Sequence, residues 1–453
     1  MAEFIPFHGL RYNVGKVALA DVLAPPYDVI KGDHRARLAA RSAYNVVGVE
    51  LPEGEGDTRY ENAARVLDDW KAQGILVRDD PTFYIYEQEF AVPGAAPQDG
   101  GSHDGGSSDG VIKKRRGVLG ALRLEEFGSG VQPHEHTLSG PKQDRLQLLR
   151  ATRTNTSPIF GLFNDNDGWV DSVVSATCAV RPICEARDAD GITHRLWRLD
   201  DDESINCVVA ALEDEPILIA DGHHRYETAL NYRNERRGAV EAAGAEWTGA
   251  EPDNYVMMMI VSTSDDGLIV LPTHRLVKGV DAGALDGLLA ALGQYFEIEE
   301  APAEGTREAA ALLRRMDEPG TEAGDAARLG LHLKGRSYSL RLKPGEAHLS
   351  AMDAERSAAY NGLDVTILHT LILERHLGIG PAELAAGGHV AYTIDAAEAF
   401  AKVDAGDYDA AFLLRSTPVQ QVQQVAAAGD KMPQKSTYFY PKLITGLVLR
   451  PLD

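Results

Sequence analysis

Cysteine is scarce in this chain of 453 residues. The chain has three cysteines, Cys178, Cys184 and Cys207. Their odd number and the absence of CxxC spacing argue against a disulfide framework. Such a pattern is typical of a protein in a reducing compartment. The chain also lacks a run of 18 apolar residues, so we expect no membrane-spanning helix. Its first residues show no cationic region followed by an apolar stretch, so we expect no secretory signal. These absences predict a soluble, cytoplasmic protein.

Positive charge is in the minority. The chain has 45 Lys and Arg against 68 Asp and Glu, which gives a net charge of −23. Nucleic acids and anionic membranes bind surfaces on which Lys and Arg cluster, so we expect neither as a partner. The basic run from Lys113 to Arg116 is isolated, and we expect it at the solvated end of a strand. A phosphate bound in a local basic pocket is compatible with this charge.

Several catalytic motifs are missing as well. Neither the HExxH pattern of zinc proteases nor the GxxxxGK[ST] pattern of P-loop proteins occurs. The sequence contains no repeat of solenoid length and no helix-turn-helix pattern. A phosphate site in this chain therefore needs another architecture.

The composition, 44% hydrophobic and 25% charged, is that of a globular protein, and the length allows two or three domains. Strand-like and helix-like hydrophobic patterns follow one another along the chain, which predicts a mixed α/β fold. The valine-containing segments 46–49 and 170–180 are expected to be strands. We expect three regions, residues 1–245, 246–350 and 351–453, with a flexible insertion rich in Gly, Ser and Asp at residues 93–110.

A strand, a tight turn and a helix are predicted around the step from Asp221 to Gly222. Residues 216–220 form a short apolar run, and apolar residues after the glycine recur at helical spacing. The first turn of this helix carries cationic side chains, those of His223, His224 and Arg225. Cations are unfavourable at the positive end of a helix, and a bound anion would reverse that effect.

We therefore predict that Gly222 and the three side chains after it bind phosphate. Backbone N–H groups, imidazoles and a guanidinium are suitable donors for such an anion. Three alternatives stay open, namely a surface helix with a poor cap, a structural histidine pair and a His-His metal site.

A rigid loop is expected near the beginning of the chain. Pro25 and Pro26 hold the following residues in a fixed conformation. Asp28 in this loop is either a catalytic or substrate-binding group or the N-cap of a helix.

Polar side chains are also concentrated between residues 134 and 145. Glu135 is a candidate acid–base group, and so is His136. Phosphates or a carboxylate would be bound by the basic side chains of this segment, His134, His136, Lys142 and Arg145. The alternative is a loop followed by a capped helix, and a His-x-His pair alone is modest evidence for a metal.

The last polar segment lies near the end of the chain. Lys435 is a point charge that could bind phosphate, together with the hydroxyl groups of Ser436 and Thr437. The alternative is a C-terminal strand with a basic flank.

These segments resemble the motifs of two known groups of proteins. The segment Ala220-Asp221-Gly222-His223-His224-Arg225 resembles the phosphate-binding signature of the ParB/sulfiredoxin-like superfamily. That superfamily includes nucleotide-binding domains of chromosome-partitioning proteins, sulfiredoxin and ADP-dependent free serine kinases. The wider pattern resembles the domain of unknown function 1015 family, and it comprises residues 24–30, 134–137, the Asp221 segment and residues 432–437.

The resemblance implies a ParB/sulfiredoxin-like core with an additional C-terminal α/β portion. It also implies a nucleotide-dependent phosphotransferase that uses ATP or ADP, with or without Mg²⁺, and acts on a small hydroxyl compound such as serine. In this hypothesis the attacking hydroxyl is oriented by a carboxylate, that of Asp28, Glu135 or Asp221. The sequence leaves the oligomeric state open.

Two other functions remain as alternatives. One is a nucleotide-switched, ParB-like binding protein without turnover. The other is a metal-dependent hydrolase that uses His134, His136, His223 and His224. The single-site hypothesis also assumes that Asp28, His134, Lys435 and the Asp221 turn converge in space.

Overall fold

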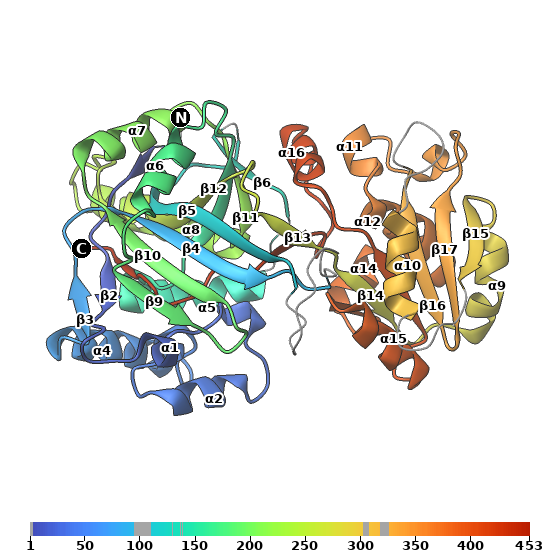
Figure 1. The fold of residues 1–453 in the computed structure, drawn as a ribbon, viewed down its shortest axis with the longest axis horizontal. Helices are drawn as coiled ribbons and strands as arrows, with labels where there is room; N and C mark the ends of the chain where they lie inside the picture. Colours follow the sequence, from blue (N-terminus) through green and yellow to red (C-terminus); the bar gives the residue numbers. More distant parts are fainter. Residues whose placement is uncertain are drawn as a thin grey trace, which may run out of the picture. The chain divides into compact units, whose positions relative to one another are not determined.

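The computed structural model describes residues 3–94, 110–128, 130–135, 137, 139–301, 308–317 and 326–453. The chain divides into two compact units (Figure 1). The first unit comprises residues 1–133, 137–269 and 441–453, and the second comprises residues 134–136 and 270–440. The predicted insertion at 93–110 lies almost entirely outside the described residues.

Among its described residues, the first unit contains a nine-stranded sheet of mixed direction. The strand order is β6-β11-β8-β12-β5-β4-β10-β9, and β1 pairs with β5. The pairs β11–β6 and β12–β8 are parallel, while the other pairs are antiparallel. The strands are β1 (Phe4–Ile5), β4 (Phe83–Ala91), β5 (Ile112–Arg123), β6 (Val131–Pro133), β8 (Ile159–Phe163), β9 (Cys184–Arg187), β10 (Thr193–Leu199), β11 (Ile217–Asp221) and β12 (Tyr255–Ser262).

Helices pack on this sheet through side chains at helical spacing. Tyr226, Ala229 and Leu230 of α8 (His223–Ala242) join the main core, and so do residues of α6 (Trp169–Thr177) and α7 (Asp202–Leu212). Helix α5 (Ser139–Thr152) lies against α8 and against α4 (Thr58–Ala72). The short helices α1 (Leu19–Val22), α2 (His34–Arg41) and α3 (Val47–Glu50) precede them in the chain.

Two small sheets complete the first unit. Strand β2 (Leu10–Tyr12) pairs with β3 (Leu76–Arg78). Strand β7 (Thr154–Asn155) pairs with β21 (Arg450–Pro451), so the C-terminal segment of the chain belongs to the first unit.

Two segments predicted as strands are helices. Residues 170–180 lie largely in α6, in which Val170 and Val174 are buried one turn apart. Residues 46–49 overlap α3, and the buried Asn45 before it accepts a hydrogen bond from the Val47 amide (3.0 Å). Valine favours strands only weakly, and burial against the core decides its conformation.

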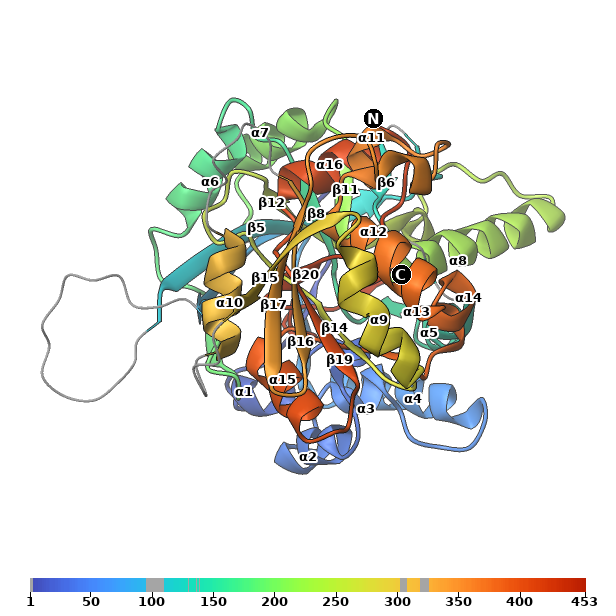
Figure 2. The ribbon, with the colours of Figure 1, turned by 90° about the vertical axis from the view of Figure 1, so that its right-hand side faces the viewer.

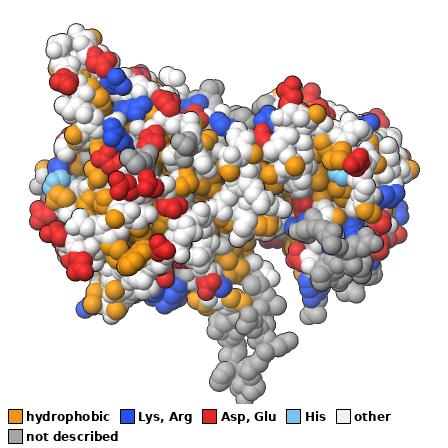
Figure 3. All heavy atoms as spheres, turned by 90° about the horizontal axis from the view of Figure 1, so that it is seen from above, with side chains coloured by type: hydrophobic (Ala, Val, Ile, Leu, Met, Phe, Trp, Pro, Cys, Tyr) orange, Lys and Arg blue, Asp and Glu red, His pale blue; other side chains and the backbone are white. Residues whose placement is uncertain are grey.

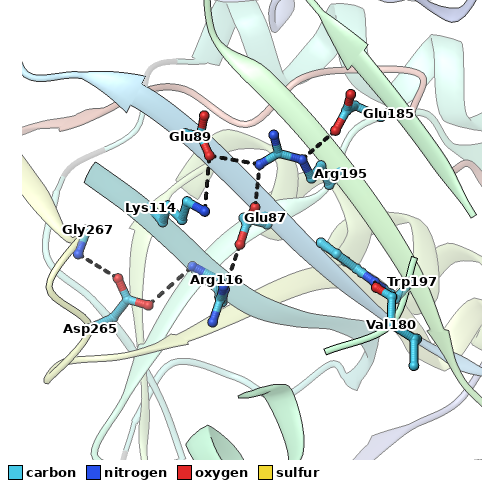
Figure 4. A network of polar contacts seen from close by, with 10 residues as sticks. All are labelled: Glu87, Glu89, Lys114, Arg116, Val180, Glu185, Arg195, Trp197, Asp265 and Gly267. Atoms are coloured by element: carbon cyan, nitrogen blue, oxygen red, sulfur yellow. Dashed lines mark hydrogen bonds and ion pairs between the residues drawn. The ribbon is translucent and has the colours of Figure 1, made fainter. Parts of the chain in front are cut away.

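The basic run at residues 113–116 lies on β5, where alternate side chains point to opposite faces. On one face, Lys114 pairs with Glu89 (3.1 Å) and Arg116 with Glu87 (2.7 Å), and Arg195 bridges both glutamates (Figure 4). On the other face, Arg115 is fully buried (0% exposed). The expected solvated strand end is therefore wrong for Arg115.

The second unit contains, among its described residues, a six-stranded antiparallel sheet in the order β15-β17-β16-β19-β14-β18. Figure 2 shows β15, β17, β16, β19 and β14 side by side. These strands are β14 (His274–Val277), β15 (Phe296–Ala301), β16 (Arg328–Leu333), β17 (Arg336–Leu342), β18 (Val390–Thr393) and β19 (Ala410–Leu414). A separate pair joins β13 (Ile269–Leu271) to β20 (Tyr438–Tyr440).

The described helices of the second unit include a pair on the sheet and one continuous helical run. Helices α10 (Glu308–Asp317) and α15 (Ala396–Asp404) pack on the sheet through one apolar cluster. A helical run then comprises α11 (Ala358–Asn361), α12 (Asp364–Ile367), the π-helix η5 (Leu368–Glu374), α13 (Arg375–Leu377) and α14 (Pro381–Ala386). The remaining helices are α9 (Ala282–Leu292) and α16 (Val419–Ala427).

The predicted mixed α/β class is confirmed by these two sheets and their helices. Within the part of the chain that the structure describes, none of the helices is both long and apolar enough to cross a membrane. Acidic and basic side chains are interspersed on the face that Figure 3 shows.

Candidate anion-binding site

The predicted strand, turn and helix around Asp221 are confirmed. Strand β11 ends at Asp221, and α8 begins at His223. Gly222 between them has φ +93°, in the left-handed region that favours glycine. A Cβ atom at this position would lie 3.0 Å from the Arg225 guanidinium, which would have to shift slightly, so the positive φ is the main reason for glycine here.

Two cations contact the Asp221 carboxylate. Nη2 of Arg225 donates a hydrogen bond to Oδ2 (2.8 Å), and Nζ of Lys442 donates one to Oδ1. The second guanidinium nitrogen of Arg225 donates to the carbonyl of Pro158. The three charged side chains together carry one net positive charge at the N-terminus of α8.

The Lys442 side chain reaches the Asp221 carboxylate because buried residues of the sheet hold the backbone of residues 441–442. The Arg115 guanidinium donates to the carbonyl of Pro441 and to the side chain of Gln88. Gln88 in turn donates to the carbonyl of Lys442 (3.0 Å). Burial lowers the pKa of Arg115 to about 10, so its guanidinium remains charged at neutral pH.

Burial by itself would raise the pKa of Asp221. Lys442, Arg225 and His223 outweigh this effect, and the pKa of Asp221 is lowered far below its ordinary value. Asp221 therefore stays ionised at neutral pH, and both of its oxygens accept hydrogen bonds from cations. The geometry suits an organising role for this carboxylate better than the role of a base, and its catalytic role stays a prediction.

The free energy of unfolding of the first unit should therefore fall at acid pH, because the pKa of Asp221 is lowered in the folded protein. The unfolded chain regains the ordinary Asp pKa of about 3.9, so below that pH it binds a proton that the folded chain does not bind. Each further pH unit should cost about 1.4 kcal/mol from this group alone until the pH reaches the folded-state pKa. Urea unfolding followed by tryptophan fluorescence measures this dependence, which Asp221→Asn should make shallower. Equal pH dependence in the two proteins would contradict the ion-pair assignment.

Lys142 is paired with an acid that sequence reasoning missed. Its Nζ lies 2.6 Å from Oε2 of Glu227 on α8, and the hydroxyl of Thr137 donates to the same oxygen (2.8 Å). The positive charge of Lys142 is therefore balanced locally. The sequence does show Glu227 two residues after the His-His-Arg run. It does not show that this glutamate pairs with Lys142, which lies 85 positions away.

Arg145 is buried (6% exposed) among other side chains of the first unit. It pairs with Asp144 and with Glu50 (3.5 Å), and its guanidinium stacks 4.4 Å from the ring centre of Tyr27. Glu50, itself 1% exposed, also accepts hydrogen bonds from Thr156 and Ser157. These contacts favour a structural role for Arg145, and phosphate binding by this residue stays a prediction.

The proline loop lies near the Asp221 turn. Burial raises the pKa of Tyr27 to about 12, and the charges of Arg225, Asp28 and Arg145 all act on its phenol. The exposed Asp28 belongs to the 3-10 helix η1 (Tyr27–Val29), whose N-cap is Pro26. The alternative of Asp28 as an N-cap is therefore wrong, since α2 takes Asp33 at that position.

A cavity of about 50 Å³ in the first unit is lined by Arg145 and Arg225. Glu50 and Ser157 also line it. This volume holds water but is far below the roughly 300 Å³ of a small-molecule site. A nucleotide therefore does not fit inside this cavity.

The segments at 134–135 and 432–437 come together in the second unit. The Met432 amide donates to the carbonyl of His134 (2.7 Å), and Nε2 of His134 lies 3.0 Å from the hydroxyl of Thr437. Oε1 of Glu135 accepts a hydrogen bond from the Lys435 amide (2.9 Å). The Ser436 hydroxyl donates to the carbonyl of Pro433. The two segments contact each other, and the ligand binding predicted for them stays a prediction.

Lys435 takes part in these contacts through its backbone. Its φ of +59° is unusual for a residue other than glycine, and the Glu135 hydrogen bond holds this conformation. The buried Arg275 donates to the Lys435 carbonyl (3.0 Å). The side chain of Lys435 is exposed, so its role as a phosphate-binding charge stays a prediction.

The histidines of the metal hypothesis are only partly described. His223 is buried, His224 is half-buried, and His136 lies outside the described residues. Across the described ranges, no three His, Cys, Asp or Glu side chains are grouped so as to hold a metal ion.

Residues 4–101 and 106–366 match the family model described as "Protein of unknown function (DUF1015)". The chain therefore belongs to this family, as its motifs predicted. No curated protein matches the chain.

Several solved structures are similar at low scores. A conserved hypothetical protein from Pyrococcus furiosus has 15% identity and a TM-score of 0.33, and the match covers 71% of this chain and 94% of that one. A free serine kinase in complex with AMP has 14% identity and a TM-score of 0.32, with 70% and 88% covered. SbnI with a C-terminal truncation from Staphylococcus aureus has 9% identity and a TM-score of 0.32, with 72% and 85% covered. Likenesses this weak carry no conclusion about activity.

Proposed function

We propose that the chain binds the phosphates of a nucleotide at the N-terminus of α8 and transfers a phosphoryl group to a small hydroxyl compound. The observation that carries the proposal is the pairing of one carboxylate, Asp221, with two cations, Lys442 and Arg225. One net positive charge is thereby held at a helix end that is itself positive. A phosphate is the kind of ligand that such an end binds.

The remaining parts of the proposed site are the first residues of α8. The N–H groups of the first helical turn have no partners within a helix and point along its axis. Gly222 lets an anion approach these groups closely, and the imidazoles of His223 and His224 add donors. This arrangement supports phosphate binding as in the ParB/sulfiredoxin-like superfamily, to which we assign the turn as part of the proposal.

Phosphoryl transfer requires positioning and neutralisation of charge more than covalent chemistry by the protein. The hydroxyl oxygen of the acceptor forms a bond to the terminal phosphorus, and the bond from that phosphorus to the bridging oxygen of the nucleotide breaks. The hydroxyl proton passes to a carboxylate and then to water. Asp28 is the proposed carboxylate, because it is exposed and adjoins Tyr27, whose phenol Arg225 influences.

Mg²⁺ in such sites neutralises phosphate charge and is held by one or two carboxylates together with the phosphates themselves. ATP or ADP is the proposed donor, and serine is the first acceptor to try. Ligand binding by His134, Glu135, Ser436 and Thr437, which lie in the second unit, stays a separate prediction.

Calorimetric titration of the full chain with ADP, ATP, CTP and inorganic phosphate, with and without Mg²⁺, tests the binding step. His224→Ala should weaken nucleotide binding about fivefold, the worth of one hydrogen bond of about 1 kcal/mol. Arg237→Ala is the matched control, because Arg237 is an exposed residue of the same helix that pairs with Glu241. It should leave the affinity unchanged. If no nucleotide and no phosphate binds, the proposal is wrong.

Phosphorus NMR of the full chain with ATP or ADP and serine tests the transfer step. A new phosphomonoester signal that Asp28→Asn abolishes is the expected result. Nucleotide binding without any phosphomonoester would instead favour the nucleotide-switched binding protein.

A further inference from the structure

The second unit contains a cavity of about 490 Å³. This volume lies within the range of small-molecule sites, about 300–1,000 Å³. Apolar residues and two tyrosines, Tyr360 and Tyr392, form part of its lining. Pro433 and Gln434, from the polar segment near the end of the chain, also line it. That segment therefore shapes a pocket wall in addition to its contacts with His134 and Glu135.

Three polar atoms of the lining residues have no hydrogen-bond partner among the described residues. They are Oγ1 of Thr366, Oδ1 of Asn361 and Nε2 of His369. Thr366 is 3% exposed, so its hydroxyl cannot turn to bulk water instead. Folded proteins seldom leave buried polar atoms unsatisfied, because each such atom costs stability. Three of them around one cavity indicate that a ligand supplies the missing partners.

Asn361 and a neutral His369 can each accept a hydrogen bond from a ligand. Nδ2 of Asn361 donates to the carbonyl of Asp353 (2.8 Å), which leaves its Oδ1 as an acceptor. Burial and the charge of Arg275 lower the pKa of His369 to about 3, so its ring is neutral and one of its nitrogens accepts a hydrogen bond. The cavity therefore presents acceptors to a ligand that carries N–H donors.

A rare backbone conformation forms one wall of the cavity. His369 and Thr370 belong to the seven-residue π-helix η5, which continues α12 and leads into α13. π-helical turns are rare and are frequent at functional sites. This observation is independent of the unpartnered atoms and points to the same cavity.

The charge of the lining disfavours an anionic ligand. Among the described lining residues, Arg356 is the cation, and Asp353 and Glu374 are the carboxylates. Arg356 is already paired with Asp430 (3.1 Å) and Asp353 (3.6 Å). Among the lining residues themselves, a phosphate would meet two carboxylates and one cation that is already paired.

We propose that this cavity binds an uncharged, amino-bearing heterocycle of the nucleoside class. The base would lie against the tyrosines, and its N–H groups would donate to Asn361 Oδ1 and His369 Nε2. This site lies within the second unit and does not rest on the function proposed for the Asp221 turn.

Calorimetric titration of the full chain with adenosine and cytidine tests this inference. Their oxo counterparts, inosine and uridine, and their 5′-monophosphates, AMP and CMP, complete the set. At least one amino nucleoside should bind, with an affinity at least tenfold higher than that of its oxo counterpart and of its monophosphate. Equal binding of all members, or no binding of any, overturns the proposal.

Thr366→Val and His369→Phe test the residues of the cavity. Both should lower the affinity at least tenfold while leaving thermal unfolding, followed by circular dichroism, unchanged or shifted upward, because each removes an unsatisfied polar atom without leaving a gap. If Thr366 and His369 only stabilised the fold, the two substitutions would instead lower the melting temperature. Affinity that neither variant changes overturns the proposal.

Thr228→Val is the matched control, since Thr228 is also a buried threonine whose Oγ1 has no partner among the described residues, but it lies in the first unit. It should not change nucleoside affinity. Lys442→Met separates the two proposals, because nucleoside binding in this cavity should survive it.

Discussion

Lys442→Met is expected to weaken the binding of inorganic phosphate and of nucleotide about 10- to 100-fold. Lys442 and Arg225 together exceed the charge of Asp221 by one, and methionine removes that excess while keeping a chain of similar length. A hydrogen bond to a charged group contributes about 1.5–3 kcal/mol, which corresponds to roughly this change in affinity. Calorimetric titration of the full chain at low salt measures it, since screening weakens charge interactions at high salt.

Lys71→Met is the matched control for this substitution. It lowers the net charge of the chain by the same amount, and the partner of Lys71, Asp68, is exposed (75%). Phosphate affinity should therefore not change. An equal loss in both variants would mean that the net charge of the whole chain decides binding, and the assignment to the Asp221 turn would be wrong.

Asp221→Asn should act in the opposite direction on binding. The amide leaves Lys442 and Arg225 without their carboxylate, so the turn gains positive charge and phosphate affinity should rise. Stability should fall at the same time, because two cations then face each other. Lower phosphate affinity in a folded Asp221→Asn protein would contradict the proposed charge balance.

The local part of the site could be predicted from sequence, and its long-range part could not. The apolar run, the glycine and the helical spacing all lie within one short segment, so the strand, the turn and α8 follow from local patterns. The partner of Asp221, in contrast, lies 221 positions away at Lys442. A sequence shows the excess of cations at a helix start, but it does not show which carboxylates neutralise them.

Burial explains most of the other differences between the predictions made from the sequence and the structure. Arg145 and Arg115 have the sequence surroundings of surface cations, yet both are buried beside aromatic rings and carbonyl groups. Valine-containing segments predicted as strands became α3 and α6, because packing decides the conformation of such short segments. Lys435 was selected for its charge, whereas the structure uses its backbone amide.

The second large effect is expected on stability, and it comes from the buried ion pair of Arg145 and Glu50. Arg145→Met should destabilise the first unit by about 3–5 kcal/mol, because Glu50 would remain buried without its cation. Trp70, Trp169, Trp197 and Trp247 are the tryptophans of the chain and all lie in the first unit. Tryptophan fluorescence during urea unfolding therefore reports on this unit without a contribution from the second.

A double-mutant cycle with Glu50→Gln separates the ion pair from other effects of the substitution. Glutamine keeps the shape of the side chain and can still accept hydrogen bonds from Thr156 and Ser157. The double variant should therefore be more stable than the sum of the single losses predicts, by about 1–3 kcal/mol. Additive losses would mean that Arg145 stabilises the unit through Tyr27 and Asp144 rather than through Glu50.

The same variants decide between a structural and a ligand-binding role for Arg145. If the role is structural, phosphate affinity measured on the folded fraction of Arg145→Met should equal that of the wild type. The guanidinium is 6% exposed and already contacts Asp144, Glu50 and Tyr27, so it has little surface left for a ligand. A loss of phosphate affinity in folded Arg145→Met would instead support the phosphate contact that the sequence suggested. In that case the Tyr27 stack would have to open when the ligand binds.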